Sequence, residues 1–136
     1  MNFLGLTVLC IFGAVQAGII TDEQKAKIIE FGKQCLEETH ADEALVRKAA
    51  NGEYVDDPSL KKHLLCFTKK AGFQNEAGDI QIETVRMKLN AITKNEKMTD
   101  DLITKCAVKK DTPEDTAFET LKCFHELSPE KQFLTA

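Results

Sequence analysis

The spacing of apolar residues is the property that most limits the folds open to this chain. Beyond residue 20, apolar side chains recur three and four positions apart, and no alternating segment of useful strand length occurs. This spacing gathers side chains on one face of an α-helix, whereas a half-buried strand needs a spacing of two. The sequence therefore predicts an all-α fold, a compact bundle of about six short helices.

Capping residues and glycines set the expected helix boundaries. Thr21 with Gln24 three positions on forms a capping box, so the first helix is expected over about residues 22–39. A second, short helix ends at Asn51-Gly52. The first helix gathers its apolar residues on one face, namely Ile28, Ile29, Gly32, Cys35 and Leu36.

The other four helices are expected to begin at polar side chains that can cap a helix N-terminus, which are Asp57, Asp79, Thr99 and Thr112. Pro58 and Pro113 follow two of these caps, and the fixed φ of proline suits the first helical position. Gly72 ends the third helix, and Ser128-Pro129 ends the sixth.

The first 17 residues differ from the rest of the chain. They contain none of the 18 basic and 22 acidic residues. An apolar run over residues 4–12 leads to a small residue at Ala17, as in a secretory signal peptide, although the usual positive charge near the start is missing. A membrane anchor is the alternative, but it needs roughly 20 apolar residues. We therefore expect residues 1–17 to be a removed signal peptide and residues 18–136 to be a secreted, extracellular domain without a membrane anchor.

The composition of the remaining chain limits its partners. Its formal net charge is −4, and Lys and Arg are not concentrated in any segment. A nucleic-acid site needs a basic patch, so we expect no nucleic-acid partner. The length fits a single domain.

Residues suited to catalysis are scarce. The two serines, Ser59 and Ser128, each lie beside a proline, where a capping or turn role accounts for them. The three histidines lack the metal spacings His-x-x-x-His and Glu-x-x-His, and His63 with Cys66 would form a metal pair only if that cysteine were reduced. No glycine-rich cofactor motif occurs. We therefore expect no catalytic residue, no metal, no cofactor and no enzyme activity.

Four cysteines remain when Cys10 is removed with the signal peptide, namely Cys35, Cys66, Cys106 and Cys123. An even number in an oxidising compartment indicates two disulfides. Four cysteines allow three pairings, and the sequence by itself does not choose among them. The alternative to two disulfides is that all four cysteines are buried with free thiols.

The cysteine spacing, with 30, 39 and 16 residues between successive cysteines, resembles that of the insect odorant-binding proteins of the pheromone-binding and general-odorant-binding family. The signal peptide, the length and the six expected helices agree with it. An unrelated secreted helical bundle is the alternative. The resemblance implies bridges from Cys35 to Cys66 and from Cys106 to Cys123.

Members of that family usually have six cysteines, so this chain resembles the four-cysteine or minus-C branch. The two missing cysteines would fall at Lys62 and Glu114. These side chains carry opposite charges, and a disulfide would hold the two positions within about 6 Å between Cα atoms. We therefore consider an ion pair in place of the disulfide, with two solvent-facing side chains as the alternative.

The resemblance also implies a function. It indicates a central apolar pocket for a small hydrophobic ligand, such as an odorant, a pheromone or a lipid-like molecule, with an odorant receptor as macromolecular partner. Burial supplies about 0.8 kcal/mol per CH₂, so about eight to ten buried carbons are sufficient for micromolar binding. The protein is expected as a monomer or weak homodimer. The alternative function is a secreted interaction protein, such as an immune or salivary factor, on the same scaffold.

The candidate ligand-binding residues are the apolar and aromatic residues of the expected helices and the chain end, namely Val46, Tyr54, Leu64, Phe67, Phe73, Ile82, Val85, Leu89, Leu102, Ile103, Phe118, Leu121, Phe124 and Phe133. An apolar stripe on a helix looks the same in a core and in a pocket wall. The alternative for each candidate residue is therefore a place in the core. Tyr54 is the candidate hydrogen-bond donor to the ligand. Phe133 and Leu134 are the candidate lid. Because histidine gains charge below about pH 6.5, His63 or His125 would favour release in acid.

Overall fold

The fold is all-α, as the apolar spacing predicts. The computed structural model describes residues 21–128, and the only strand-like feature in this part is one isolated bridge between Gln74 and Ile80. The helices are α2 (Asp22–Thr39), α3 (Glu43–Ala50), α4 (Pro58–Ala71), α5 (Ile82–Thr93), α6 (Glu96–Cys106) and α7 (Pro113–Leu127).

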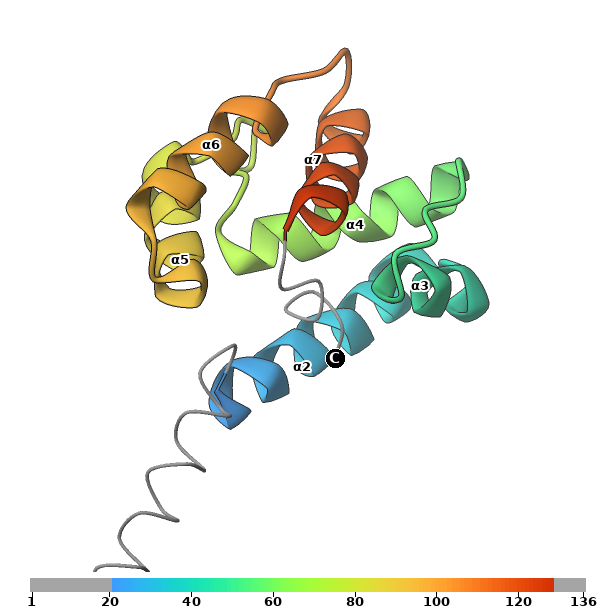
Figure 1. Ribbon diagram of the computed structural model, residues 1–136. Coiled ribbons are helices and arrows are strands. Elements are labelled where there is room, and N and C mark those ends of the chain that lie inside the picture. Colours follow the sequence, from blue (N-terminus) through green and yellow to red (C-terminus); the bar gives the residue numbers. More distant parts are fainter. Residues whose placement is uncertain (1–20, 129–136) are drawn as a thin grey trace, which may run out of the picture.

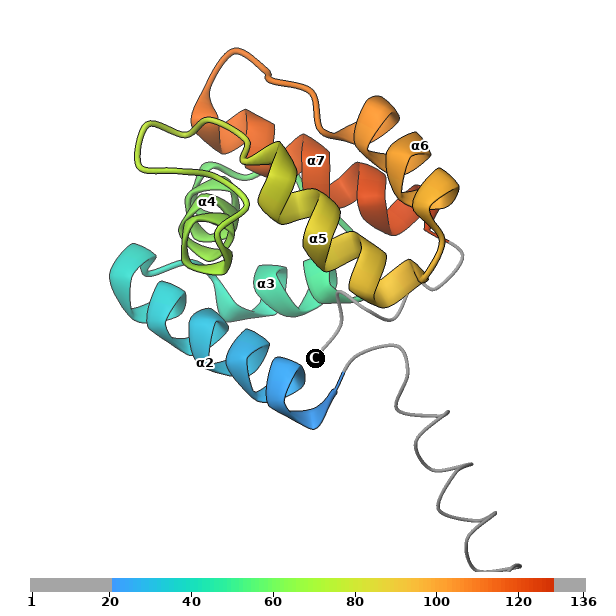
Figure 2. The same cartoon turned by 90° about the vertical axis from the view of Figure 1, so that its left-hand side faces the viewer.

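Helix α4 lies at the centre of the bundle (Figure 1). It packs against α2 on one side and against α7 on the other, and the short α3 also contacts it. Helices α5 and α6 pack against each other, and α6 also packs on α7 (Figure 2). Helix α2 is therefore an outer layer that is held mainly by α4.

Two disulfides fix these contacts. Cys35–Cys66 joins α2 to α4 with 5.7 Å between Cα atoms, and Cys106–Cys123 joins α6 to α7 with 5.3 Å. This is the pairing that the family resemblance implies. The first bridge ties the outer helix α2 to the centre of the bundle.

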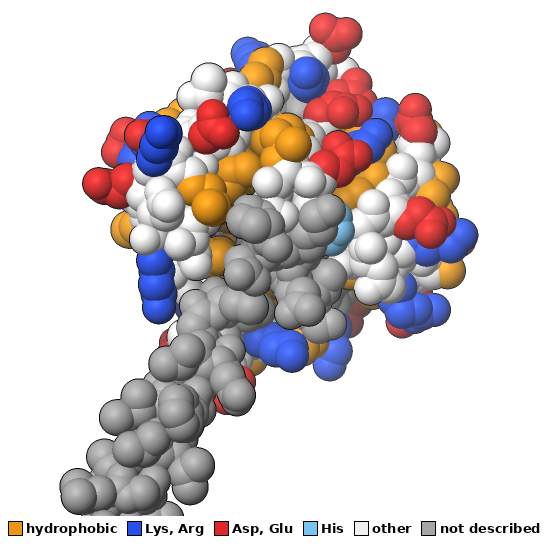
Figure 3. All heavy atoms as spheres, viewed as in Figure 1, with side chains coloured by type: hydrophobic (Ala, Val, Ile, Leu, Met, Phe, Trp, Pro, Cys, Tyr) orange, Lys and Arg blue, Asp and Glu red, His pale blue; other side chains and the backbone are white. Residues whose placement is uncertain are grey.

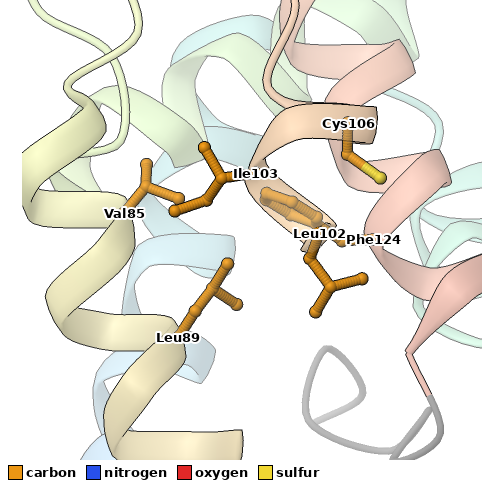
Figure 4. Close-up of a cluster of buried hydrophobic side chains, with 6 residues drawn as sticks. All are labelled: Val85, Leu89, Leu102, Ile103, Cys106 and Phe124. Atoms are coloured by element: carbon orange, nitrogen blue, oxygen red, sulfur yellow. The ribbon is translucent and has the colours of Figure 1, made fainter. Parts of the chain in front are cut away.

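Two groups of buried apolar side chains form the core. The first group lies between α5, α6 and α7 (Figure 4) and consists of Val85, Leu89, Leu102, Ile103, Cys106 and Phe124. The second lies between α3, α4 and α7 and consists of Ala49, Leu60, Leu64, Ala117, Phe118 and Leu121. Helix α2 contributes to neither group.

Side-chain caps mark five of the six helix starts in the described residues. In the predicted capping box, Gln24 N donates to Thr21 Oγ1 at 3.1 Å and Thr21 N donates to Gln24 Oε1 at 2.9 Å. Asp42 caps α3, and Asp57 and Thr112 cap α4 and α7 ahead of their prolines. These caps supply acceptors for backbone N–H groups that have no partner within the helix.

The predicted start of α5 at Asp79 is wrong. The helix begins at Ile82, and Asp79 belongs to a closed loop in which its N–H donates to Asn75 Oδ1 at 2.9 Å. Gln74 pins this loop, because its buried Nε2 donates to the carbonyls of Gly78 and Pro113 at 2.8 and 3.2 Å. The bond to Gly78 lies within the loop and the bond to Pro113 is tertiary, and together they override the capping preference of Asp79.

The predicted start of α6 at Thr99 is also wrong. Asn95 caps the helix, accepting from the N–H of Met98, and Thr99 lies inside the first turns, fully buried. The hydroxyls of Thr93 and Thr99 lie 2.8 Å apart, which satisfies the buried group. Asn and Thr are both good N-caps, and the earlier one starts the helix.

The hypothesis of an ion pair between Lys62 and Glu114 does not hold. Neither residue forms an ion pair in the described part of the chain, where Lys62 is exposed and Glu114 half-buried. The α4–α7 ion pair lies one residue away on both helices, with Lys61 Nζ 2.8 Å from Asp115 Oδ1.

Candidate ligand-binding cavities

Helix α2 leaves most of its apolar face outside the core. Of its 18 residues only Cys35 is buried, although Ile28, Phe31 and Leu36 share the half-buried side of the helix and Ile29 is 43% exposed. An amphipathic helix normally buries its apolar stripe against a neighbour. Here the stripe borders two cavities, one on each side of the contact with α4.

The first, which we call the α2/α3 cavity, has a volume of about 280 Å³. It is mainly apolar and carries a rim of mixed charge. Its lining comes from α2, α3, α4 and α7 with one loop residue, and consists of Ile28, Ile29, Gly32, Lys33, Leu36, Glu43, Val46, Arg47, Ala49, Ala50, Tyr54, His63, Leu64, Phe67 and Leu121.

The second, which we call the α2/α5 cavity, is larger, with a volume of about 450 Å³. Its wall is rich in aromatic side chains. The lining residues are Gln24, Lys27, Ile28, Phe31, Phe67, Lys70, Ala71, Phe73, Met87, Lys88, Leu89, Ala91, Ile92 and Phe124.

Two side chains separate the cavities. Ile28 of α2 and Phe67 of α4 line both. Phe67 meets Phe31 of α2 edge to face, with 6.2 Å between ring centroids. This geometry is favourable for aromatic pairs, so the partition is a packed contact.

Besides its charged residues, the lining of the α2/α3 cavity contains two polar side chains, those of His63 and Tyr54. His63 is 2% exposed, and its Nδ1 has no hydrogen-bond partner. Burial lowers the pKa of His63, and the carbonyl of Cys35 partly opposes this shift. Burial, together with the charge of Glu126, raises the pKa of Tyr54 well above its usual range. Both side chains are therefore neutral near pH 7.

A third hollow, of about 460 Å³, lies along α4 near Cys66. Charged side chains dominate its lining, which is formed by Glu38, Lys62, Leu65, Cys66, Lys69, Lys70 and Glu76. It therefore lacks the apolar wall that a hydrophobic ligand needs.

Eight of the candidate ligand-binding residues line the two apolar cavities, namely Val46, Tyr54, Leu64, Phe67, Phe73, Leu89, Leu121 and Phe124. The structure places Val85, Leu102, Ile103 and Phe118 in the core, with Ile82 packed against it. Phe133 and Leu134 lie outside the described residues. The tyrosine hydroxyl makes no hydrogen bond with a described residue, and its ring packs on Phe118 with centroids 5.7 Å apart.

The candidate set from the sequence omits the α2 wall. Ile28, Phe31 and Leu36 line the cavities, as do Met87 and Ile92 of α5. The signal that could have identified the α2 residues is the long apolar stripe on a helix whose disulfide cysteine lies within that stripe.

Apolar side chains also remain exposed on the surface among acidic and basic ones (Figure 3).

The described residues contain no group of three His, Cys, Asp or Glu side chains placed to hold a metal ion. Within residues 21–128, none of the helices combines the length and apolar character needed to cross a membrane.

Comparison with known proteins gives consistent matches. A sequence profile of the PBP/GOBP family matches residues 18–127. The B2 protein of Tenebrio molitor is 39% identical over 115 residues, covering 85% of this chain and 88% of that protein. The fatty acid binding protein OBP56a from the oral disk of the blowfly Phormia regina has a TM-score of 0.65 and 28% identity, over 79% of this chain and 93% of that one. The THP12 carrier protein of the yellow mealworm has a TM-score of 0.58 and 38% identity, over 70% and 88%.

Proposed function

The chain belongs to the PBP/GOBP family of insect odorant-binding proteins, and on this premise we propose that it carries small apolar ligands, such as odorants, pheromones or lipid-like molecules, in the cavities beside α2. The observation that carries this proposal is the apolar face of α2, which borders two cavities instead of the core. A carrier needs an apolar space of this kind and few polar groups.

The volumes and linings support binding at useful affinity. Burying a ligand yields about 0.8 kcal/mol per CH₂, so a chain of about eight to ten carbons supplies enough free energy for micromolar binding. One relative is described as fatty acid binding and another as a carrier protein, which agrees with the transport of apolar molecules.

The proposal also covers export, the absence of ligand conversion, the oligomeric state and the macromolecular partner. The protein is exported after cleavage at Ala17, and the start of the family match at residue 18 supports this boundary. It binds its ligand without chemical conversion, acts as a monomer or weak homodimer, and delivers the ligand to an odorant receptor.

Native mass spectrometry of the purified mature chain, residues 18–136, tests the proposal. We expect a small apolar molecule to co-purify, or an added fluorescent apolar probe to bind with micromolar Kd and to be displaced by aliphatic alcohols. An empty protein that binds neither the probe nor any aliphatic ligand, with both disulfides intact, would contradict a carrier function and favour the interaction-protein alternative.

A further inference from the structure

The charged residues around the α2/α5 cavity are all of one sign. Its described lining includes Lys27, Lys70 and Lys88 and no Asp or Glu. The chain as a whole has more acidic than basic residues, 22 against 18. A cavity lined by three lysines and no acid therefore departs from the average surface of this protein.

These lysines come from three different helices. Lys27 lies on α2, Lys70 in the last turn of α4, and Lys88 on α5. Figure 1 shows the C-terminal end of α4 beside α5, with the first half of α2 below them. The fold therefore brings separate positive charges to one cavity.

Within residues 21–128, most of this positive charge is not neutralised by acidic side chains. Lys70 Nζ lies 2.9 Å from Glu38 Oε2. Lys27 and Lys88 are exposed, and neither forms an ion pair with a described residue. Two ammonium groups beside an apolar wall are therefore available to a ligand.

The α2/α3 cavity differs in this respect. Its charged lining residues are Lys33, Arg47 and Glu43, and Arg47 Nη1 lies 2.9 Å from Glu43 Oε1. An acid within the same lining already balances one cation there. Lys33 forms no ion pair with a described residue, so the α2/α3 cavity keeps one unpaired cation, whereas the larger and more aromatic α2/α5 cavity keeps two.

From this arrangement we infer that the α2/α5 cavity selects amphiphiles with an anionic head, specifically aliphatic carboxylates, over uncharged ligands of equal chain length. The inference rests on the proposed carrier function and names the ligand class of one of its cavities. The tail lies against Phe67, Leu89 and Phe124, and the carboxylate remains at the rim near Lys27 and Lys88.

The expected selectivity follows from the exposure of these lysines. An exposed ion pair changes an equilibrium constant by about threefold, so two such pairs give roughly a tenfold preference for the carboxylate. Screening by salt weakens such pairs, so the preference should shrink at high ionic strength.

Isothermal titration of the mature protein with dodecanoate, dodecanol and methyl dodecanoate tests this inference. The Lys27→Gln/Lys88→Gln double variant removes the two unpaired charges, and Lys25→Gln is the matched control, because Lys25 is exposed on α2 and lines neither cavity. We expect the wild type and the control to prefer dodecanoate by roughly tenfold at low salt. The double variant should lose this preference while binding dodecanol as the wild type does.

The outcomes separate the two proposals. Equal affinity for the acid and the alcohol in the wild type, or an equal loss for both ligands in the double variant, overturns the anion inference and leaves the carrier function in place. An effect of Lys25→Gln equal to that of the double variant also overturns it, because the preference would then depend on a charge outside both cavities. Failure of all three ligands to bind contradicts the carrier function itself.

Discussion

Lys61 Nζ lies 2.8 Å from Asp115 Oδ1 and 2.9 Å from Asp56 Oδ1, so one ammonium group links α4, α7 and the loop before α4. The same ammonium lies 5.2 Å from the centroid of the Phe118 ring. The hydrogen bond from Lys61, supplemented by Thr112, holds the pKa of Asp115 below its usual range. This contact fastens α7 to α4 where no disulfide does so.

Replacing Lys61 with Met keeps the aliphatic stem and removes the charge, so we expect Lys61→Met to lower Tm at neutral pH. The control is Lys105→Met, which breaks an exposed pair with Asp101 within α6 and should change Tm little. Circular dichroism melts of both variants measure the difference. Equal Tm values for the two variants would show that the α4–α7 contact contributes no stability.

Acid should remove the effect of the Lys61 contact. A carboxyl group whose pKa is lowered by folding contributes stability that is present above its unfolded pKa of about 3.9 and is lost as the pH falls through the folded value. The Tm difference between wild type and Lys61→Met is therefore expected to be largest at neutral pH and to shrink below about pH 4. A difference that stays constant down to pH 2 would assign the effect to the cation–π contact of Lys61 with Phe118.

His63 should make the protein less stable in weak acid. Burial lowers its pKa, so the unfolded chain takes up a proton first as the pH falls. The stability contributed by neutral His63 is therefore present above the unfolded pKa of about 6.5 and is lost as the pH falls from there toward the folded value. Urea unfolding between pH 7.5 and 5 should show a falling free energy of unfolding.

The variant His63→Leu should reduce this slope, because it removes the titrating group. His40→Asn is the matched control, since His40 is exposed at the end of α2 with φ 57°, a conformation that Asn tolerates. It should keep the wild-type slope. An unchanged slope in His63→Leu would exclude His63 as the acid-sensitive group.

The sequence predicts the fold more completely than it predicts the ligand-binding cavities. Helix starts with redundant local signals, such as Thr21 with Gln24 or Thr112 with Pro113, are confirmed because the residues that cap also fix the backbone. The prediction for Asp79 fails because Gln74 holds its loop through the nearby carbonyl of Gly78 and the distant carbonyl of Pro113. The second contact joins residues far apart in sequence, and local patterns do not contain it.

The cavities depend even more on tertiary structure. Phe118 and Phe67 both lie on apolar faces of helices, yet Phe118 is in the core and Phe67 divides the cavities. The difference arises because α2 touches the bundle mainly along α4 through the Cys35–Cys66 bridge, which leaves open space on both sides. The spacing of apolar residues identifies which face points inward but not how completely a neighbour fills the space.

Two glycines should respond in opposite ways to an added methyl group. Gly78 has φ 90°, and a Cβ there would lie 2.5 Å from Pro113 Cβ, so we expect Gly78→Ala to destabilise the protein by about 1–3 kcal/mol. Gly32 lies within α2, and a Cβ there meets nothing within 4 Å. Gly32→Ala should therefore stabilise by about 0.4–1 kcal/mol. Urea unfolding of both variants measures these changes, and a stable Gly78→Ala would show that the loop can move away from Pro113.

Phe67 should determine how long a ligand the protein accepts, because this ring separates the two cavities. Phe67→Ala joins them into one space, so we expect the preferred chain length in a series of aliphatic alcohols to increase. The matched control is Phe73→Ala, which widens only the α2/α5 cavity and should shift the preference less. Because Phe67 is only half-buried, its truncation should cost less than the about 3–5 kcal/mol typical of a fully buried Phe→Ala change. Displacement of a fluorescent apolar probe across the series gives the measurement. An unchanged chain-length optimum in Phe67→Ala, with folding intact, would mean that ligands occupy one cavity and never pass the partition.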